Sequence, residues 1–148
     1  MKTLTLTTVA AVAAIGAASL PSPIDAKVVE FKVTKVESPA FEGRTFGAVG
    51  AYEQITARAR IAVDPADRHN AGIVDVAAAP RNARGQVEFE ADVTILKPID
   101  MSKANGRMFY DVNNRGNKLA LGWINDAVNV NGLKAAGDAG NGFLMNSG

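Results

Sequence analysis

The sequence contains no cysteine and a single histidine, and these absences exclude several kinds of site. Without a thiol, the chain has no disulfide, no cysteine nucleophile and no cysteine-based metal centre. The usual nitrogen and sulfur ligands of a zinc site are therefore missing. Like charges do not cluster either: 16 basic and 15 acidic residues give a net charge of +1. This balance does not predict a nucleic-acid-binding surface.

The first 26 residues have the layout of a secretory signal peptide. Lys2 precedes an uncharged apolar stretch over residues 4–20, and a polar segment interrupted by proline follows. Cleavage after Ala18 or Ala26 fits the small-residue rule, and we favour Ala26 because a strand pattern begins directly after it. A membrane anchor or a buried helix is the alternative, although the stretch is short for a span. We expect an exported protein, periplasmic or secreted, with no membrane span after removal of the leader.

Alternating apolar and polar residues predict strands over residues 28–36, 54–63 and 86–96. A further short strand is expected over residues 73–78. Turn-forming sequences, "DPADRHNAG" and "PRNARG", separate the later strands. Strands joined by such short turns predict an antiparallel β-meander with one face in solvent.

The pattern changes in the last third of the chain. Residues 107–112, "RMFYDV", are mostly apolar on both faces, as in a strand that is covered on two sides. Apolar residues at helical spacing follow from Ala120 to Val128, and Asn131 with the next glycine is a reasonable stop. Residues 143–148 are expected to form a final helical turn. The sequence therefore predicts an antiparallel β-meander that leads into a first βα unit, in an incomplete α/β domain over residues 27–148.

The loop "NNRGN" lies between the expected strand and helix of this βα unit. Ligands of α/β sheets gather at the carboxyl ends of strands, where loops expose backbone amides. The loop residues are Asn113, Asn114, Arg115, Gly116 and Asn117. Their amide and guanidinium groups could hold an oxyanion or a carboxylate. Alternatively, they cap the helix and shape the turn, which are ordinary uses of asparagine and glycine.

Four segments resemble the N-terminal region of a group of exported bacterial proteins described as alpha/beta hydrolase domain-containing. They are "FEGRTFGAVGAYEQI", "NAGIVDVAAAPRNARGQVEFEADVTILKP", "GRMFYDVNNRGNK" and "DAGNGFLMNSG", and the resemblance covers nearly all of residues 27–148. It implies an α/β-hydrolase-like fold and a serine-type carboxylic ester hydrolase. It also implies that Asn114, Arg115 and Gly116 belong to the oxyanion loop, although the usual His-Gly-Gly motif is absent.

The catalytic machinery of such an enzyme is missing from this sequence. No G-x-S-x-G nucleophile elbow occurs, and the serines after the leader, Ser38, Ser102 and Ser147, lie in expected loops or ends. The single histidine, His69, lies in a turn and has no evident nucleophile or orienting acid, so we interpret it as a solvated turn residue. We therefore expect no catalytic residue in this chain, with the nucleophile, acid and histidine beyond it.

Other candidate sites have ordinary interpretations. Glu88, Glu90 and Asp92 alternate along one strand and could suggest paired carboxylates or a calcium site. A solvated strand face, with Arg58 and Arg60 opposite the carboxylates, is the simpler interpretation. "GDAGNG" lacks the glycine order of a dinucleotide fingerprint and the Lys-Ser/Thr of a phosphate loop, so no cofactor is expected.

Two functions follow from these observations. The first is the N-terminal portion of an exported ester hydrolase that acts on a small-molecule ester. The second is a periplasmic small-molecule binding or interaction module without catalysis, in which the "NNRGN" loop binds an anionic ligand.

Overall fold

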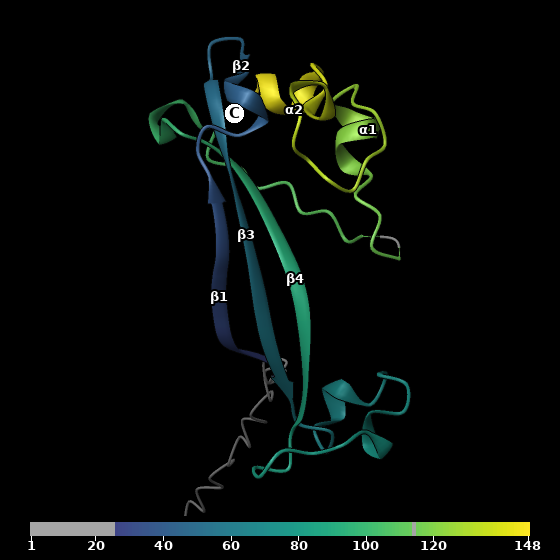
Figure 1. Ribbon diagram of the computed structural model, residues 1–148. Coiled ribbons are helices and arrows are strands. Elements are labelled where there is room, and N and C mark those ends of the chain that lie inside the picture. The colour runs from purple at the N-terminus through teal and green to yellow at the C-terminus, as the bar shows by residue number, and fades with distance from the viewer. Residues whose placement is uncertain (1–25, 114) are drawn as a thin grey trace, which may run out of the picture.

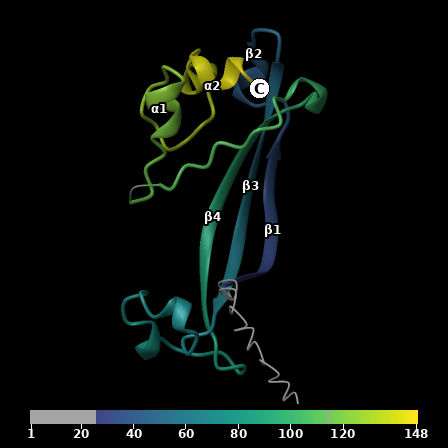
Figure 2. The same ribbon diagram turned by 180° about the vertical axis from the view of Figure 1, so that it is seen from behind.

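Three long antiparallel strands dominate the computed structural model, which describes residues 26–113 and 115–148. The strands β1 (Lys27–Glu37), β3 (Gly50–Val63) and β4 (Val87–Pro98) form a sheet with β3 in the centre. A short strand, β2 (Thr45–Phe46), pairs with the start of β3 and completes an open four-stranded sheet. Figure 1 shows a long, narrow sheet with α1 and α2 at one end and the β3–β4 connection with its short helices at the other, and Figure 2 shows it from behind.

The predicted meander is confirmed, because its alternating sequence is compatible with a pleated ladder. Each long strand extends a few residues beyond its predicted range at one end or both. Every strand pair among the described residues is antiparallel, so this part of the chain contains no parallel α/β core. No helix in the described part is long and apolar enough to cross a membrane.

The two faces of the sheet differ in chemistry. On one face, apolar residues of β1, β3 and β4 lie side by side in rows, such as Phe31, Ala59 and Ala91. The remaining three rows are Val28, Ile61 and Phe89; Val33, Ala57 and Val93; Val36, Ile55 and Ile95. Register irregularities in β1 between residues 28 and 30 and between 33 and 35 keep the rows in line.

The other face carries the charged residues in cross-strand ion pairs. Arg60 contacts Glu88 at 2.9 Å and Glu30 at 3.1 Å, and Arg58 contacts Asp92 at 3.3 Å. This confirms the expected pairing of arginines with carboxylates across the meander. Solvent reaches both faces, because several large residues of the apolar face are also exposed. The expectation of a single wet face is therefore wrong.

The connection from β3 to β4 contains two short 3-10 helices, η2 (Arg68–Asn70) and η3 (Val76–Ala78), instead of the strand expected over residues 73–78. Asp75 has a φ of +57°, a left-handed conformation that an extended strand cannot contain. Upstream, the Asp64 side chain accepts a hydrogen bond from the amide of Ala66 at 2.8 Å. Local side-chain bonds of this kind favour turns over strands.

A small apolar core joins the β2 end of the sheet to the C-terminal segments. Its residues come from η1 (Phe41–Gly43), the β2–β3 hairpin, α1 (Ala120–Ile124), η5 (Ala136–Ala139) and α2 (Phe143–Asn146), with additional loop residues. Phe46 and Tyr52 pack edge to face, with ring centroids 5.5 Å apart. The Tyr52 hydroxyl donates a hydrogen bond to the carbonyl oxygen of Met145 at 2.8 Å. The C-terminal segments are therefore tied to the sheet, and the expected final helical turn is confirmed as α2.

The strand expected over residues 107–112 is not formed, so the predicted first βα unit is wrong. These residues follow η4 (Met101–Lys103) without regular secondary structure, and Met108, Tyr110 and Val112 are largely exposed. Their apolar pattern matches a covered strand, but a strand also needs a neighbouring strand edge for its backbone hydrogen bonds.

The helix α1 is much shorter than the one expected over Ala120 to Val128. It ends at Ile124 because Asn125 turns inward and Asp126 takes a φ of +52°. Leu121 is the buried residue of this helix, whereas Trp123, which lies in the predicted apolar stripe, is 75% exposed. The predicted buried face is therefore wrong at Trp123.

Candidate functional site

The candidate oxyanion loop forms a tight turn at Arg115 and Gly116, while Asn114 lies outside the described residues. Arg115 has a φ of +54° and Gly116 a φ of +81°. Successive positive φ values are typical of the central residues of a type I′ turn. Glycine tolerates this conformation freely, whereas arginine adopts it at a cost of about 1 kcal/mol or more. Both residues are exposed, so the turn is presented to solvent.

Hydrogen bonds fix the chain on the C-terminal side of this turn. The Asn131 side chain donates to Asn117 Oδ1 at 3.1 Å and accepts from the backbone amide of Lys118 at 3.0 Å. The Lys118 ammonium also donates to the backbone carbonyl oxygen of Asn131 at 2.9 Å. These contacts join the chain after the turn to a residue 13 or 14 positions away.

The Asp111 carboxylate occupies the start of α1. Its Oδ2 atom accepts hydrogen bonds from the amides of Leu119 at 3.3 Å and Ala120 at 3.2 Å. These two amides already have an anionic partner, so they are not free to hold an oxyanion. The helix-capping role considered for the asparagines thus belongs to Asp111. Asp111 lies eight positions before Leu119, far outside the usual capping spacing, so no local sequence pattern indicates this contact.

The sheet carboxylates form ion pairs and no metal cluster. The pKa of Glu88 is lowered first by a hydrogen bond from the Asn82 side chain, at 2.7 Å, and next by Arg60. Both contacts stabilise the ionised carboxylate. Among the described residues, no group of three or more acidic, histidine or cysteine side chains has an arrangement that could hold a metal ion.

His69 is paired with Asp67 in the turn that follows β3. The His69 Nδ1 atom lies 2.8 Å from Asp67 Oδ1, and the same oxygen accepts the His69 backbone amide at 2.8 Å. The backbone hydrogen bond is the main cause that lowers the pKa of Asp67. The pair resembles the acid–base half of a catalytic triad. Asp67 is, however, the N-cap residue of the short helix η2, and His69 lies within that helix.

The serines after the leader lie at the opposite end of the sheet from His69. Ser38 follows β1, Ser102 lies in η4 and Ser147 directly follows α2, which lies near the start of β3 (Figure 1). The 14 residues of β3 separate these ends, and an extended strand of that length spans roughly 40 Å. Ser102 Oγ donates to Asp100 Oδ1 at 2.6 Å, and Ser147 Oγ donates to the Phe143 carbonyl oxygen at 2.8 Å. Neither hydroxyl is oriented by a histidine.

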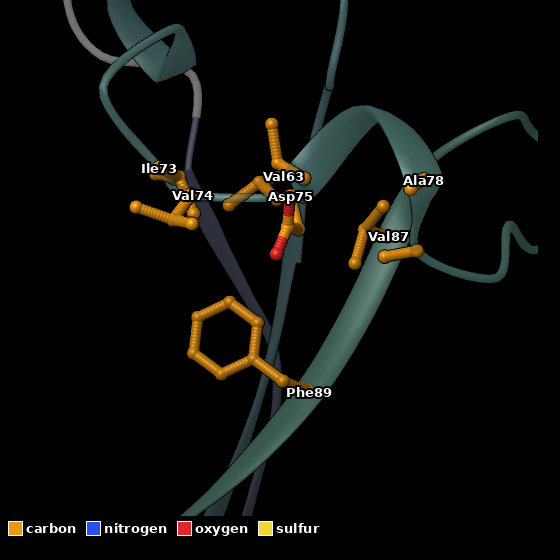
Figure 3. A pocket seen from close by; sticks show the side chains of 9 residues that line it. Val63, Ile73, Val74, Asp75, Ala78, Val87 and Phe89 are labelled. Atoms are coloured by element: carbon orange, nitrogen blue, oxygen red, sulfur yellow. The ribbon is translucent and has the colours of Figure 1, made fainter.

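An apolar groove of about 410 Å³ lies where the β3–β4 connection overhangs the end of the sheet. Figure 3 shows the Phe89 ring reaching from β4 beneath Ile73 and Val74. Val63 and Val87 form the sheet side of the groove, and its one acidic residue is Asp75. The sequence does not predict the groove, because its pattern predicts a strand over residues 73–78.

The described residues thus offer an exposed polar turn at Arg115 and Gly116 and, at the far end of the sheet, an apolar groove. Neither contains a nucleophile beside a base. Comparison with models of known protein families finds no match for this chain, and comparisons with curated proteins and with solved structures also find none.

Proposed function

We propose that this chain supplies the oxyanion loop and part of the scaffold of an exported serine-type α/β-hydrolase that acts on carboxylic esters. The nucleophile, its acid and its histidine lie beyond this chain in this proposal. Its sequence basis is the resemblance carried by the four segments quoted above. The proposed substrate is a small-molecule ester, and no cofactor takes part.

The observation that carries the proposal is the left-handed turn at Arg115 and Gly116. An oxyanion site needs N–H donors that are fixed before the charge develops, because reorienting them during the reaction costs free energy. The Asn117–Asn131 hydrogen bond supports the turn from one side, and Asp111 fixes the helix that follows it. These contacts flank the exposed turn and support its proposed role as a pre-formed donor site.

The proposed reaction assigns this chain one task. A serine outside the chain attacks the ester carbonyl, and its proton passes through the histidine to the leaving alcohol as the acyl-enzyme forms. Water then releases the acid by the reverse proton path. Donors at Arg115 and Gly116 stabilise the negative oxygen in both steps. This chain alone has no turnover.

Two protein samples test the proposal. One is the 148-residue chain and the other is the product of the uninterrupted reading frame that contains it. Both are assayed with short-chain p-nitrophenyl esters and with a fluorophosphonate probe that labels activated serines. We expect labelling and hydrolysis only in the longer product. Labelling of the 148-residue chain, or an inactive and unlabelled longer product, would overturn the proposal.

A non-catalytic binding or interaction module is the second candidate, and one observation favours it. The apolar sheet face and residues 107–112 expose large side chains that a partner could cover. On this hypothesis the Arg115 turn binds a small anion. Calorimetric titration of the chain with acetate and phosphate separates the two candidates. Saturable binding without hydrolysis in any form of the protein supports the module.

A further inference from the structure

The apolar sheet face is a continuous surface of four rows across three strands. The 12 residues of these rows include no charged or polar side chain. Six of them are among the exposed large hydrophobic residues: Val28 at 62%, Phe31 at 49%, Val33 at 49%, Val36 at 54%, Phe89 at 47% and Ile95 at 37%. The described part of the chain therefore leaves the middle of this face open.

The face is level rather than hollow along its centre. Ala57 and Ala59 of β3 are only 1% and 6% exposed, although their β1 neighbours Val33 and Phe31 are each 49% exposed. Larger side chains from β1 and β4 must therefore close over these alanines. A level apolar sheet face is the kind that packs against another sheet in a β-sandwich.

The exposed area just reaches what a weak dimer needs. Large apolar side chains offer on the order of 150–250 Å² each when fully exposed, so the six exposed fractions correspond to about 500 Å² per molecule. Two such faces bury at most about 1,000 Å², which is below the range of about 1,200–2,000 Å² for standard interfaces but reaches the minimum of about 1,000 Å² for a specific one. A patch of about 500 Å² per molecule is within the range of the largest apolar patch on a typical monomer, and such patches are often functional.

The opposite face does not offer a comparable surface. Its arginines already contact carboxylates of the same sheet, as in the Arg60–Glu88 and Arg58–Asp92 pairs. A partner there would have to compete with these pairs and remove water from charged groups. The apolar face loses no such interaction when it is covered.

We propose that two copies of this chain pack face to face through the apolar side of the β1–β3–β4 sheet. The row of Phe31, Ala59 and Ala91 favours a second copy as the partner that covers this face. Phe31 lies on one side of Ala59, and the small Ala91 lies on the other. A two-fold axis along β3 places Phe31 of each copy over Ala91 of the other. The same contact then occurs twice, as a closed two-fold dimer requires.

In the neighbouring row the larger side chain is on β4 and the smaller one on β1. Phe89 of β4 and the smaller Val28 of β1 flank Ile61, so the same axis places Phe89, at the mouth of the groove beneath Ile73 and Val74, opposite Val28 of the second copy. Each phenylalanine thus meets a smaller side chain. The dimer goes beyond the proposed function, since it requires neither catalysis nor the Arg115 turn.

Sedimentation velocity of the 148-residue chain and its variants tests the dimer. We expect a concentration-dependent dimer whose dissociation constant rises by about 100-fold or more in Phe31→Ala, because each dimer loses two buried aromatic contacts. Lys32→Ala, on the charged face of the same strand, is the matched control and leaves the dissociation constant unchanged. Circular dichroism verifies that each variant keeps its sheet.

A size exchange tests the contact itself. Ala91→Phe alone also weakens the dimer, because two phenylalanines then meet. The double variant Phe31→Ala/Ala91→Phe restores association to within about tenfold of the original chain. A monomeric original chain, open-ended aggregates, or a dimer that is insensitive to Phe31→Ala would overturn the proposal. Failure of the exchange would overturn the placement of the axis. These readouts do not involve ester hydrolysis, so they are independent of the proposed function.

Discussion

Asn125 Oδ1 accepts a hydrogen bond from the backbone amide of Met145 at 2.8 Å, across 20 positions of sequence. The same side chain donates from Nδ2 to the carbonyl oxygen of Ala139, and the Asn125 residue is fully buried. One asparagine thus satisfies polar groups of two separate backbone segments. The C-terminal segments have short helices and few long-range contacts between them, so this asparagine is central to their arrangement.

We expect Asn125→Ala to lower the free energy of unfolding by about 2–4 kcal/mol, because it leaves a buried amide and a buried carbonyl without partners. Asn129→Ala, at an exposed position nearby, is the control and changes stability by about 0.5 kcal/mol or less. Urea denaturation followed by circular dichroism measures both. Equal effects of the two substitutions would contradict the structural role of Asn125.

Gly140 approaches the Asn125 backbone more closely than any other residue type allows. A Cβ atom at Gly140 would overlap the carbonyl oxygen of Asn125, and the φ of Gly140 is +67°. We expect Gly140→Ala to destabilise the protein by about 3 kcal/mol or more, since it combines a steric overlap with backbone strain. Gly137→Ala, where a Cβ meets nothing within 4 Å, is the control. Urea midpoints of the two variants should differ clearly.

The hydrogen bonds to Glu88 predict acid-dependent stability of the sheet. Its folded-state pKa lies below the ordinary value of 4.5, chiefly because of Asn82 and then Arg60. The contribution is therefore fully present above 4.5 and is lost as the pH falls through the depressed folded-state pKa. We expect Glu88→Gln to lower the melting temperature at neutral pH, and the difference from the original chain to shrink in acid. A difference independent of pH would contradict this linkage.

Gly116 provides a test of the proposed oxyanion loop, in the product of the uninterrupted reading frame that the proposed function requires. We expect Gly116→Ala to reduce kcat by about tenfold or more with a smaller change in KM, because it displaces donors that act on the transition state. Gly85→Ala is the matched control, since Gly85 also has a positive φ, +77°, and open space around it. The control should retain kcat. Equal losses in the two variants would indicate general strain rather than a role in the site.

The signal peptide expected over residues 1–26 gives a prediction that depends on sequence alone. Expression with residues 1–26 in a Gram-negative host should yield a mature chain that begins at Lys27, as measured by intact-mass spectrometry of the periplasmic fraction. A mature chain that begins at Ser19 would indicate cleavage after Ala18. An uncleaved chain in the cytoplasm would contradict export.

The sequence predicted those parts of the fold that depend on local alternation. The strands β1, β3 and β4 and their charged and apolar faces follow from a period of two, which holds wherever neighbouring strands pair. The Arg58 and Arg60 ion pairs followed from the same pattern. The location of the turn at Arg115 and Gly116 was also evident, because asparagine and glycine favour left-handed backbone.

The tertiary structure decided the rest, since its causes lie far apart in sequence. Residues 107–112 have the apolar composition of a strand, yet they pair with no strand of the described part of the chain. Asn125 ends α1 because its partners, Ala139 and Met145, arrive from segments 14 and 20 positions later. Periodicity determines which face of a segment is apolar. Only the arrangement of distant segments determines whether that face is covered and whether a strand finds a neighbour.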